Sequence, residues 1–168
     1  MFAELTDGVV VIRVLGRGSF ANSVELKKLA ESLAEKHATD HYQFILDLHD
    51  CSTMDSTFMG VLASIGLRQK RDGNAQMAIV NANEQSTRLL QTLGLSHFIN
   101  VRREGQTPDA AFSAADFQCV GQHDVSKMER IIHMIEAHQN LCDVDNSNNV
   151  RFESVLKYLH ESLDREKH

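Results

Sequence analysis

Asp55, Ser56 and Thr57 place one carboxyl group and two hydroxyl groups directly before an apolar segment, within MDSTFMGVL at residues 54–62. Such a run is typical of a helix start, because its oxygens accept hydrogen bonds from the unpaired N–H groups of the first turn. The same place suits a phosphoacceptor, since the helix dipole favours a phosphate, which would add about −1.5 to −2 charges beside Asp55. The run therefore predicts a helix start and, as a functional hypothesis, a phosphorylation switch at Ser56.

A second candidate site is GRGSFA at residues 16–21, which has the glycine spacing of a dinucleotide-binding loop. In that motif the helix begins within the glycines, whereas here the capping residues come later, at Asn22 or Ser23. A domain of about a hundred residues also cannot supply both nucleotide-binding halves. We interpret the glycines as a surface loop and expect no cofactor, with a nucleotide-dependent enzyme as the alternative.

A third candidate, DVDNSNNVRFES at residues 143–154, overlays a calcium-binding loop. Three oxygen-bearing side chains fall at ligand positions: Asp143, Asp145 and Ser147. However, Asn148 stands where the sharp turn requires glycine, and Ser154 stands where a bidentate glutamate is required. We predict a structural turn and keep a calcium-responsive binding protein as an alternative function.

Serine–histidine catalysis and metal binding find little support in the sequence. There is no G-x-S-x-G elbow, and nothing positions a histidine as a base for Ser56. The nine histidines are scattered, and His133 and His138 are five residues apart, which is off one helix face. We interpret them as surface and core-edge histidines and expect no metal site. Three cysteines at irregular spacing indicate reduced thiols in a cytoplasm: Cys51, Cys119 and Cys142.

Composition favours a folded protein with protein partners. The 168 residues are 42% hydrophobic, which is enough for a substantial core. A net charge of −6 argues against a broad surface for nucleic acid or an anionic membrane. The first residues lack a signal-peptide pattern, and no apolar run approaches membrane-spanning length. We therefore expect a soluble, cytoplasmic protein.

Strand and helix patterns alternate over residues 1–103. Asp7-Gly8 suits a tight hairpin turn between two extended runs, and an N-cap pattern at Asn22 begins the first helix. Further strands are predicted at residues 42–48, 75–80 and 98–101, and further helices at 55–70 and 83–93. The alternation predicts an α/β fold, with a mixed, mostly parallel sheet of four to five strands and helices packed on it.

The C-terminal part differs in character. Residues 104–123 contain the single proline and small residues without a clear period, which predicts a linker. Residues 124–168 carry two apolar stripes at helical spacing, which predicts an α-helical hairpin. Residues 1–103 have eleven acidic and eleven basic side chains, whereas the remainder has twelve and six. We expect the acidic hairpin to fold back on its own domain, and docking on a basic partner is the alternative.

These features resemble the STAS domain, the anti-sigma factor antagonist fold of bacterial partner-switching systems. The resemblance covers residues 1–103 and rests on a strand that ends in Asp47-Leu48, a short loop and a characteristic helix start. Typical members have Asp-Ser-Ser-Gly-Leu-Gly at that start, and this sequence has Asp55-Ser56-Thr57-Phe58-Met59-Gly60. Phe58 departs from the usual glycine, and we expect its bulky ring to lie beside the site.

The resemblance implies that Ser56 is the phosphoacceptor and that residues 55–60 form the partner-binding surface. The unphosphorylated protein would bind an anti-sigma factor or a serine protein kinase. Phosphorylation of Ser56 would release the partner, and a PP2C-like phosphatase would restore binding. The protein itself would not be an enzyme. A non-switching STAS module, as in lipid-transport or sulfate-transporter assemblies, is the alternative, and the identity of the regulator and homodimer formation are left open.

Overall fold

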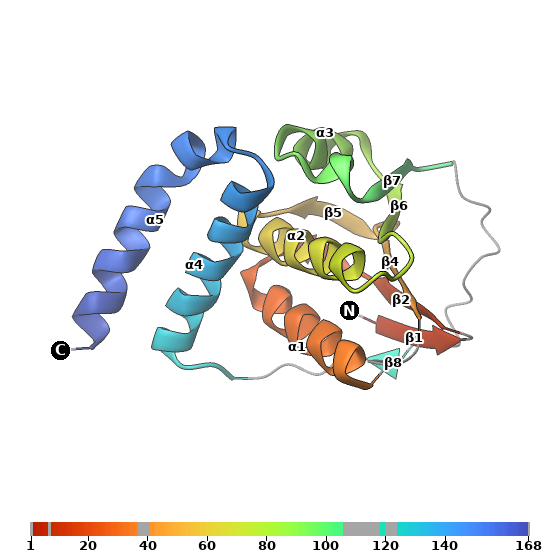
Figure 1. The fold of residues 1–168 in the computed structure, drawn as a ribbon, viewed down its shortest axis with the longest axis horizontal. Helices are drawn as coiled ribbons and strands as arrows, with labels where there is room; N and C mark the ends of the chain where they lie inside the picture. Colours follow the sequence, from red (N-terminus) through yellow and green to blue (C-terminus); the bar gives the residue numbers. More distant parts are fainter. Residues whose placement is uncertain (1, 7, 37–40, 106–117, 120–123, 168) are drawn as a thin grey trace.

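A six-stranded sheet organises the structure, a computed structural model that describes residues 2–6, 8–36, 41–105, 118–119 and 124–167. The strand order is β7-β6-β4-β2-β1-β8. The strands are β1 (Phe2–Thr6), β2 (Val9–Arg13), β4 (Gln43–Asp47), β6 (Ala78–Ala82), β7 (Asn100–Arg103) and β8 (Gln118–Cys119). Four of them, β7, β6, β4 and β2, are parallel neighbours, and β1 and β8 pair antiparallel at one edge (Figure 1). The predicted mixed, mostly parallel α/β fold is confirmed.

The sheet is one strand larger than predicted. Strand β8 lies within the segment predicted as a linker, residues 104–123, and pairs with β1. Most of that segment lies outside the described residues. A two-residue strand has no hydrophobic pattern of its own, so the sequence does not indicate it. It is recognised only in the structure, where it pairs with the otherwise open edge of β1.

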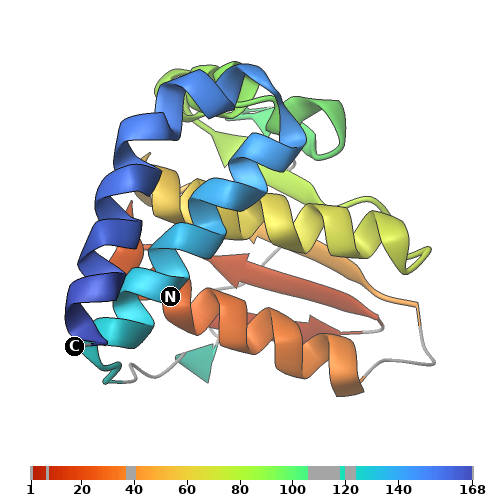
Figure 2. The same cartoon turned by 60° about the vertical axis from the view of Figure 1, so that its left-hand side comes forward.

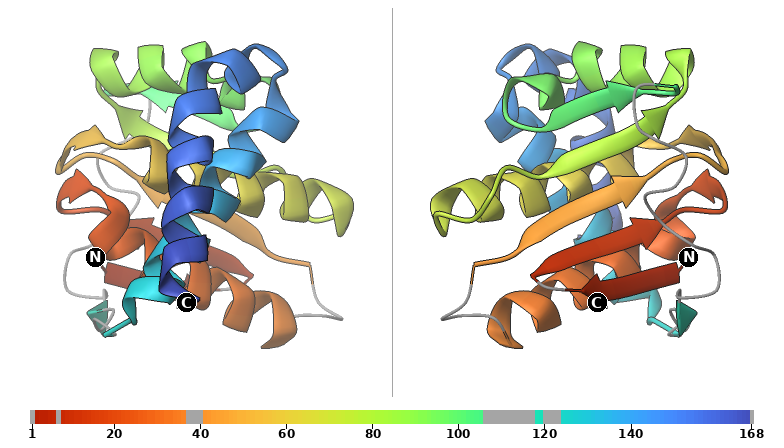
Figure 3. Two further views of the ribbon diagram at one scale, coloured as in Figure 1. Left: turned by 90° about the vertical axis from the view of Figure 1, so that its left-hand side faces the viewer. Right: turned by 90° about the vertical axis from the view of Figure 1, so that its right-hand side faces the viewer.

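Two helices, α1 (Phe20–Lys36) and α2 (Ser56–Arg71), lie side by side on one face of the sheet (Figures 1 and 3). The core between helices and sheet is apolar, and its fully buried side chains include Ile12, Phe44, Leu46 and Leu62. Helix α3 (Glu84–Thr92) begins after Asn83, as predicted, and is followed by the short helix η1 (Leu95–His97). Burial of this apolar surface is the main stabilising contribution to the domain.

Several boundaries differ from the sequence predictions because distant segments set them. Helix α1 begins at Phe20, two residues before the predicted cap Asn22. The glycine segment is not a surface loop but strand β3 (Gly16–Gly18), which pairs in parallel with β5 (Cys51–Met54) in a second, two-stranded sheet. Because the glycines lie in a strand and not in a helix start, the dinucleotide-binding alternative loses its structural basis.

The C-terminal hairpin is confirmed and folds back on the domain. Helix α4 (Lys127–Val144) crosses the N-terminal ends of α1 and α2, and helix α5 (Ser147–Glu166) packs on the outer side of α4 (Figure 2). The two helices share a small apolar cluster formed by Ile131, Ile135 and Leu159. Among the described residues, no helix combines the length and apolar character that a membrane span requires.

The connection between α4 and α5 is a two-residue turn at Asp145 and Asn146, and the predicted structural turn is confirmed. Asp143 still belongs to α4, and residues 147–154 already belong to α5, so the calcium-loop alternative is wrong. The Asp145 carboxylate accepts a hydrogen bond from the backbone N–H of Ser147 at 2.8 Å. The described chain also contains no cluster of three metal-ligating side chains.

Candidate functional site

Asp55 caps two helices at once. Its Oδ1 accepts a hydrogen bond from Phe58 N at 2.9 Å, which makes Asp55 the N-cap of α2. Its Oδ2 accepts a hydrogen bond from Phe20 N, also at 2.9 Å, at the start of α1. One carboxylate therefore satisfies orphan donors of both helices and fixes their N-terminal ends beside each other. Because Asp55 does the capping, Ser56 is the first residue of α2 and its hydroxyl is not needed as a cap.

The loop before Asp55 is anchored by a buried polar network at the end of β4. The Asp47 carboxylate forms an ion pair with Arg13 at 2.8 Å and accepts a hydrogen bond from Asn81 Nδ2 at 2.9 Å. Asn81 has a positive φ of 56°, a conformation that asparagine adopts more readily than most residues. Two neighbouring strands thus hold the acid that the resemblance identified. The network fixes where the chain leaves the sheet on its way to Ser56.

The residues after Ser56 are mostly buried. Thr57, Met59 and Gly60 are buried, and Phe58 is completely inaccessible. The Phe58 ring lies against Gly18, where an added Cβ would be 2.8 Å from a ring carbon. The ring therefore points into the core, which corrects the expectation that it lies beside the site. In this conformation only Asp55 and Ser56 of the predicted partner-binding residues are partly exposed.

The Ser56 hydroxyl contacts a histidine from the hairpin. Ser56 Oγ lies 2.9 Å from His138 Nε2, and His138 Nδ1 lies 2.7 Å from the carbonyl oxygen of Met134. A carbonyl only accepts, so Nδ1 carries the hydrogen, and in the neutral imidazole Nε2 accepts the hydrogen of the Ser56 hydroxyl. Nothing in the sequence indicated a histidine as a base for Ser56, but the structure places His138 against its hydroxyl. The partner is 82 residues away in the sequence, on a helix outside the motif.

A second serine–histidine contact joins α4 to α1. His133 Nε2 lies 2.7 Å from Ser23 Oγ, which itself donates to the Phe20 carbonyl. Because the serine has a single hydroxyl hydrogen, His133 Nε2–H is the donor in this contact. Burial lowers the pKa of the His133 imidazole, and the nearby Lys27 ammonium acts in the same direction. The two histidines face different helices of the domain, so a spacing of five residues buries both, whereas from the sequence we interpreted the histidines as surface and core-edge residues.

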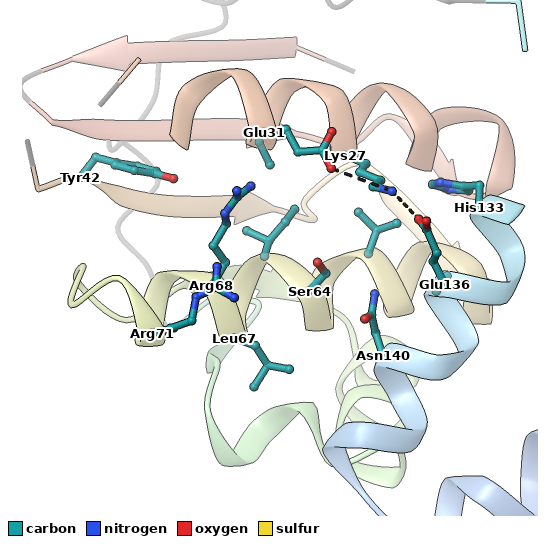
Figure 4. Close-up of a pocket in the computed structure, with 14 residues that line it drawn as sticks. Lys27, Glu31, Tyr42, Ser64, Leu67, Arg68, Arg71, His133, Glu136 and Asn140 are labelled. Atoms are coloured by element: carbon teal, nitrogen blue, oxygen red, sulfur yellow. Dashed lines mark hydrogen bonds and ion pairs between the residues drawn. The ribbon is translucent and has the colours of Figure 1, made fainter. Parts of the chain in front are cut away.

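Ser56, His138 and the Met134 carbonyl form the same chain of hydrogen bonds as a nucleophile, a base and a group that orients the base. Hydrolysis also needs room for a substrate at the hydroxyl. A cavity of about 440 Å³ lies between α1, α2 and α4, and Figure 4 shows Lys27, Ser64, Arg68 and Asn140 around it. Its lining includes His133 but neither Ser56 nor His138. This cavity therefore gives a substrate no access to the Ser56 hydroxyl.

Comparison with protein families decides the class of the first part of the chain. The model of the STAS domain family matches residues 2–107. The protein belongs to the STAS family. Its match covers the sheet through β7, both capped helices and the Asp55–Gly60 motif, and it ends before α4. The hairpin, with His133 and His138, therefore lies outside the part that the STAS family explains.

Solved structures agree on the fold. The crystal structure of TM1081 from Thermotoga maritima, a candidate anti-sigma factor antagonist, matches with 23% identity and a TM-score of 0.53, over 60% of this chain and 83% of that one. The NMR structure of TM1081 matches with 22% identity and a TM-score of 0.51, over 60% and 78%. The anti-sigma factor antagonist SpoIIAA in its unphosphorylated form matches with 19% identity and a TM-score of 0.46, over 54% and 80%. No curated protein matches the chain.

The hairpin contacts are the part of the site that sequence reasoning missed. Helix α4 supplies His133, His138 and Asn140, and Asn140 Nδ2 donates to the Gly60 carbonyl at 3.4 Å. The apolar stripes of the hairpin indicate that it is buried somewhere, but they do not say against which helix. Only the three-dimensional arrangement brings His138 and Asn140 to the start of α2 and His133 to the start of α1.

Proposed function

We propose that this STAS protein is a phosphorylation-controlled partner-switching regulator, an anti-sigma factor antagonist of the cytoplasm. Unphosphorylated, it binds an anti-sigma factor or a serine protein kinase through the surface around Asp55 and Ser56. Phosphorylation of Ser56 releases that partner, and a PP2C-like phosphatase reverses the change. The protein is the substrate of these reactions and catalyses none of them.

One observation carries the proposal: Asp55 caps α2, and the neighbouring Ser56 is a half-buried first residue whose hydroxyl is free of that task. A phosphate on Ser56 would lie at the positive end of the α2 dipole, so the helix tolerates the modification. It would also add negative charge next to Asp55 and repel an acidic or closely packed partner. The description of TM1081 as a candidate antagonist agrees with this role.

Phosphate mapping tests the proposal directly. Protein purified from its native cells should carry a phosphate on the peptide that contains Ser56, located by mass spectrometry. In pull-downs from the same cells, Ser56→Ala should retain its regulator continuously, and Ser56→Asp should retain less of it. The matched control is Ser52→Ala, because Ser52 is an exposed residue on the preceding strand β5 whose Oγ donates to the Gly16 carbonyl. That variant should behave as the unaltered chain does.

The same experiment separates the switch from the alternative within the family. If Ser56→Ala and Ser56→Asp retain the same partners equally and no phosphate is found on Ser56, the protein is a non-switching STAS interaction module. The partly exposed Asp55 and Ser56 would then contribute only a constant docking surface.

A further inference from the structure

Helix α4 lies directly on the helix that begins at Ser56. Gly60, one turn into α2, has no side chain, and the backbone of Ala137 occupies the space where one would be. A Cβ added to Gly60 would lie 2.7 Å from the Cα atom of Ala137 and closer still to its carbonyl group. The backbones of α2 and α4 therefore meet at this glycine, and α4 cannot stay in place if position 60 carries a side chain.

The same helix closes over the Ser56 hydroxyl. His138 is only 4% exposed and its Nε2 accepts a hydrogen bond from the Ser56 hydroxyl, while its ring packs edge-on against Phe152 of α5 at 5.0 Å. A kinase must bring a phosphoryl donor to Ser56 Oγ, and the added group needs room for three further oxygens. The imidazole and the helix that carries it take part of that room. The docked hairpin thus partly covers the half-buried residue that the proposed function requires to be modified.

We propose that the α4–α5 hairpin is an intramolecular cover of Ser56, which reacts only in an open form from which the hairpin has separated. This inference rests on the proposed function, since it describes how access to the same serine is controlled. A covalently attached cover acts at a high effective concentration, so a partner or kinase meets only the open fraction of molecules.

The contacts between hairpin and domain allow such a separation. Helices α4 and α5 hold each other through their own cluster of Ile131, Ile135 and Leu159, which does not depend on the domain core. Among the described residues, the hairpin places three buried apolar side chains in that core, Leu141, Cys142 and Phe152, and Val144 and Leu156 pack against it. A hairpin with internal packing of its own can leave as one unit, so opening costs only the contacts across the seam.

The seam itself is partly polar. The 440 Å³ cavity between α1, α2 and α4 is lined by charged and amide side chains as well as apolar ones such as Leu67, and Lys27 of α1 pairs there with Glu136 of α4 (Figure 4). At the far end, Asn148 donates to the carbonyls of Leu93 and Leu141, but its buried Oδ1 has no partner among the described residues. The polar part of the seam gains less from docking than a dry apolar interface of the same extent, and the orphaned oxygen opposes closure.

A thiol in place of the hydroxyl can test the cover without any partner. In the full chain, Ser56→Cys puts a thiol at a helix N-terminus, where its thiolate is favoured and it reacts readily when it is uncovered. The probe is iodoacetamide, and peptide-resolved mass spectrometry gives the alkylation rate at each cysteine. Cys142 lies in the seam and reports separation of the hairpin, whereas Cys51 is buried in the domain and reports unfolding of the whole protein.

Two changes should release the cover. Gly60→Ala inserts a methyl group against Ala137, and it favours α2 itself because alanine is a better helix former than glycine. Phe152→Asp puts a charge where α5 packs against the core. In either background the thiol at position 56 should react at least about tenfold faster, and Cys142 should follow while Cys51 stays protected. Lys70→Ala, on an exposed position of α2, is the matched control and should change none of the three rates.

Equal alkylation rates at position 56 in the unaltered, Gly60→Ala and Phe152→Asp backgrounds would overturn the inference. It would also be overturned if Cys142 became reactive while the thiol at position 56 did not, because the hairpin would then have left without uncovering the serine. Since no kinase takes part, this result is independent of whether phosphate is found on Ser56. Failure of the cover and failure of the switch are therefore distinguishable.

Discussion

The STAS domain and the α4–α5 hairpin are held by contacts of different kinds. The domain is built around one continuous apolar core in which central side chains such as Phe44 and Leu46 are completely buried. The hairpin has a small cluster of its own and reaches the domain through three buried apolar anchors, two serine–histidine contacts, hydrogen bonds from Asn140 and Asn148, and a partly exposed ion pair. The motif therefore lies in the part of the molecule with the continuous core, whereas the region that covers it can separate from it.

The largest effect should distinguish the two regions by stability. Phe44→Ala removes a fully buried ring from the central strand β4 and should cost about 3–5 kcal/mol of unfolding free energy. Leu159→Ala removes a side chain from the hairpin cluster, where a cost of about 2–3 kcal/mol falls on the hairpin alone. Urea titration with thiol labelling checks this: Phe44→Ala should expose Cys51 and Cys142 together, and Leu159→Ala should expose Cys142 first.

The control for this pair is Leu67→Ala, which shortens a partly exposed side chain on α2 and should change stability by less than about 1 kcal/mol. If Leu159→Ala exposed Cys51 and Cys142 at the same urea concentration, the hairpin and the domain would form one cooperative unit. The separation of the two regions would then be wrong.

A smaller effect should appear at the helix caps. Asp55→Ala removes hydrogen bonds to both α1 and α2 and should cost about 2–3 kcal/mol, because each lost cap is worth about 1 kcal/mol or somewhat more. Ser126→Ala removes the capping box of α4 alone and should cost about 1 kcal/mol, confined to the hairpin. Denaturant unfolding measures the first and hydrogen exchange in α4 measures the second. Equal global costs for the two variants would contradict the double role of Asp55.

The sequence predicted these regions to different extents. The strands and helices of the STAS domain follow from local periodicity, and the Asp55–Gly60 motif follows from residue types. Both could therefore be predicted from the sequence. The start of α1 was misplaced because its capping acceptor, the Asp55 carboxylate, lies 35 residues away. The role of Gly60 was equally hidden, since nothing near it in the sequence shows that the backbone of Ala137 takes the place of a side chain.

The histidines show why the site itself was harder to predict than the fold. A spacing of five residues places two side chains on different faces of a helix. A helix packed on a single neighbour would therefore bury only one of the two. Helix α4 crosses two neighbours, so His133 reaches Ser23 and His138 reaches Ser56. Periodicity describes how a helix is divided into faces. It does not describe how many partners the helix crosses.

Acidification should loosen the hairpin by a modest amount. The pKa of His133 is lowered in the folded protein, chiefly by burial, so the docked form binds fewer protons than the separated form. The contribution of neutral His133 to docking is therefore fully present above the ordinary histidine pKa of about 6.5 and is lost as the pH falls below it. Hydrogen exchange of α4, corrected for intrinsic rates, should speed up between about pH 7.5 and about pH 5.5, on either side of that pKa.

The control for the pH effect is His133→Gln, whose amide N–H can still donate to Ser23 Oγ but does not titrate in this range. In that variant the corrected exchange rates of α4 should lose most of their pH dependence. An undiminished acceleration on acidification would assign the effect to another group in the seam.

The smallest effects should come from two ion pairs that look alike but join different parts. Lys27 pairs with Glu136 and connects α1 to α4, whereas Lys127 pairs with Glu166 and connects α4 to α5. Both pairs are partly or largely exposed, so replacing either lysine with alanine should cost no more than about 1 kcal/mol and less at high salt. Only Lys27→Ala should speed the alkylation of Cys142, because only this pair crosses the seam. If Lys127→Ala exposed Cys142 equally, fraying of the hairpin would govern access to the seam, and its separation as one unit would be wrong.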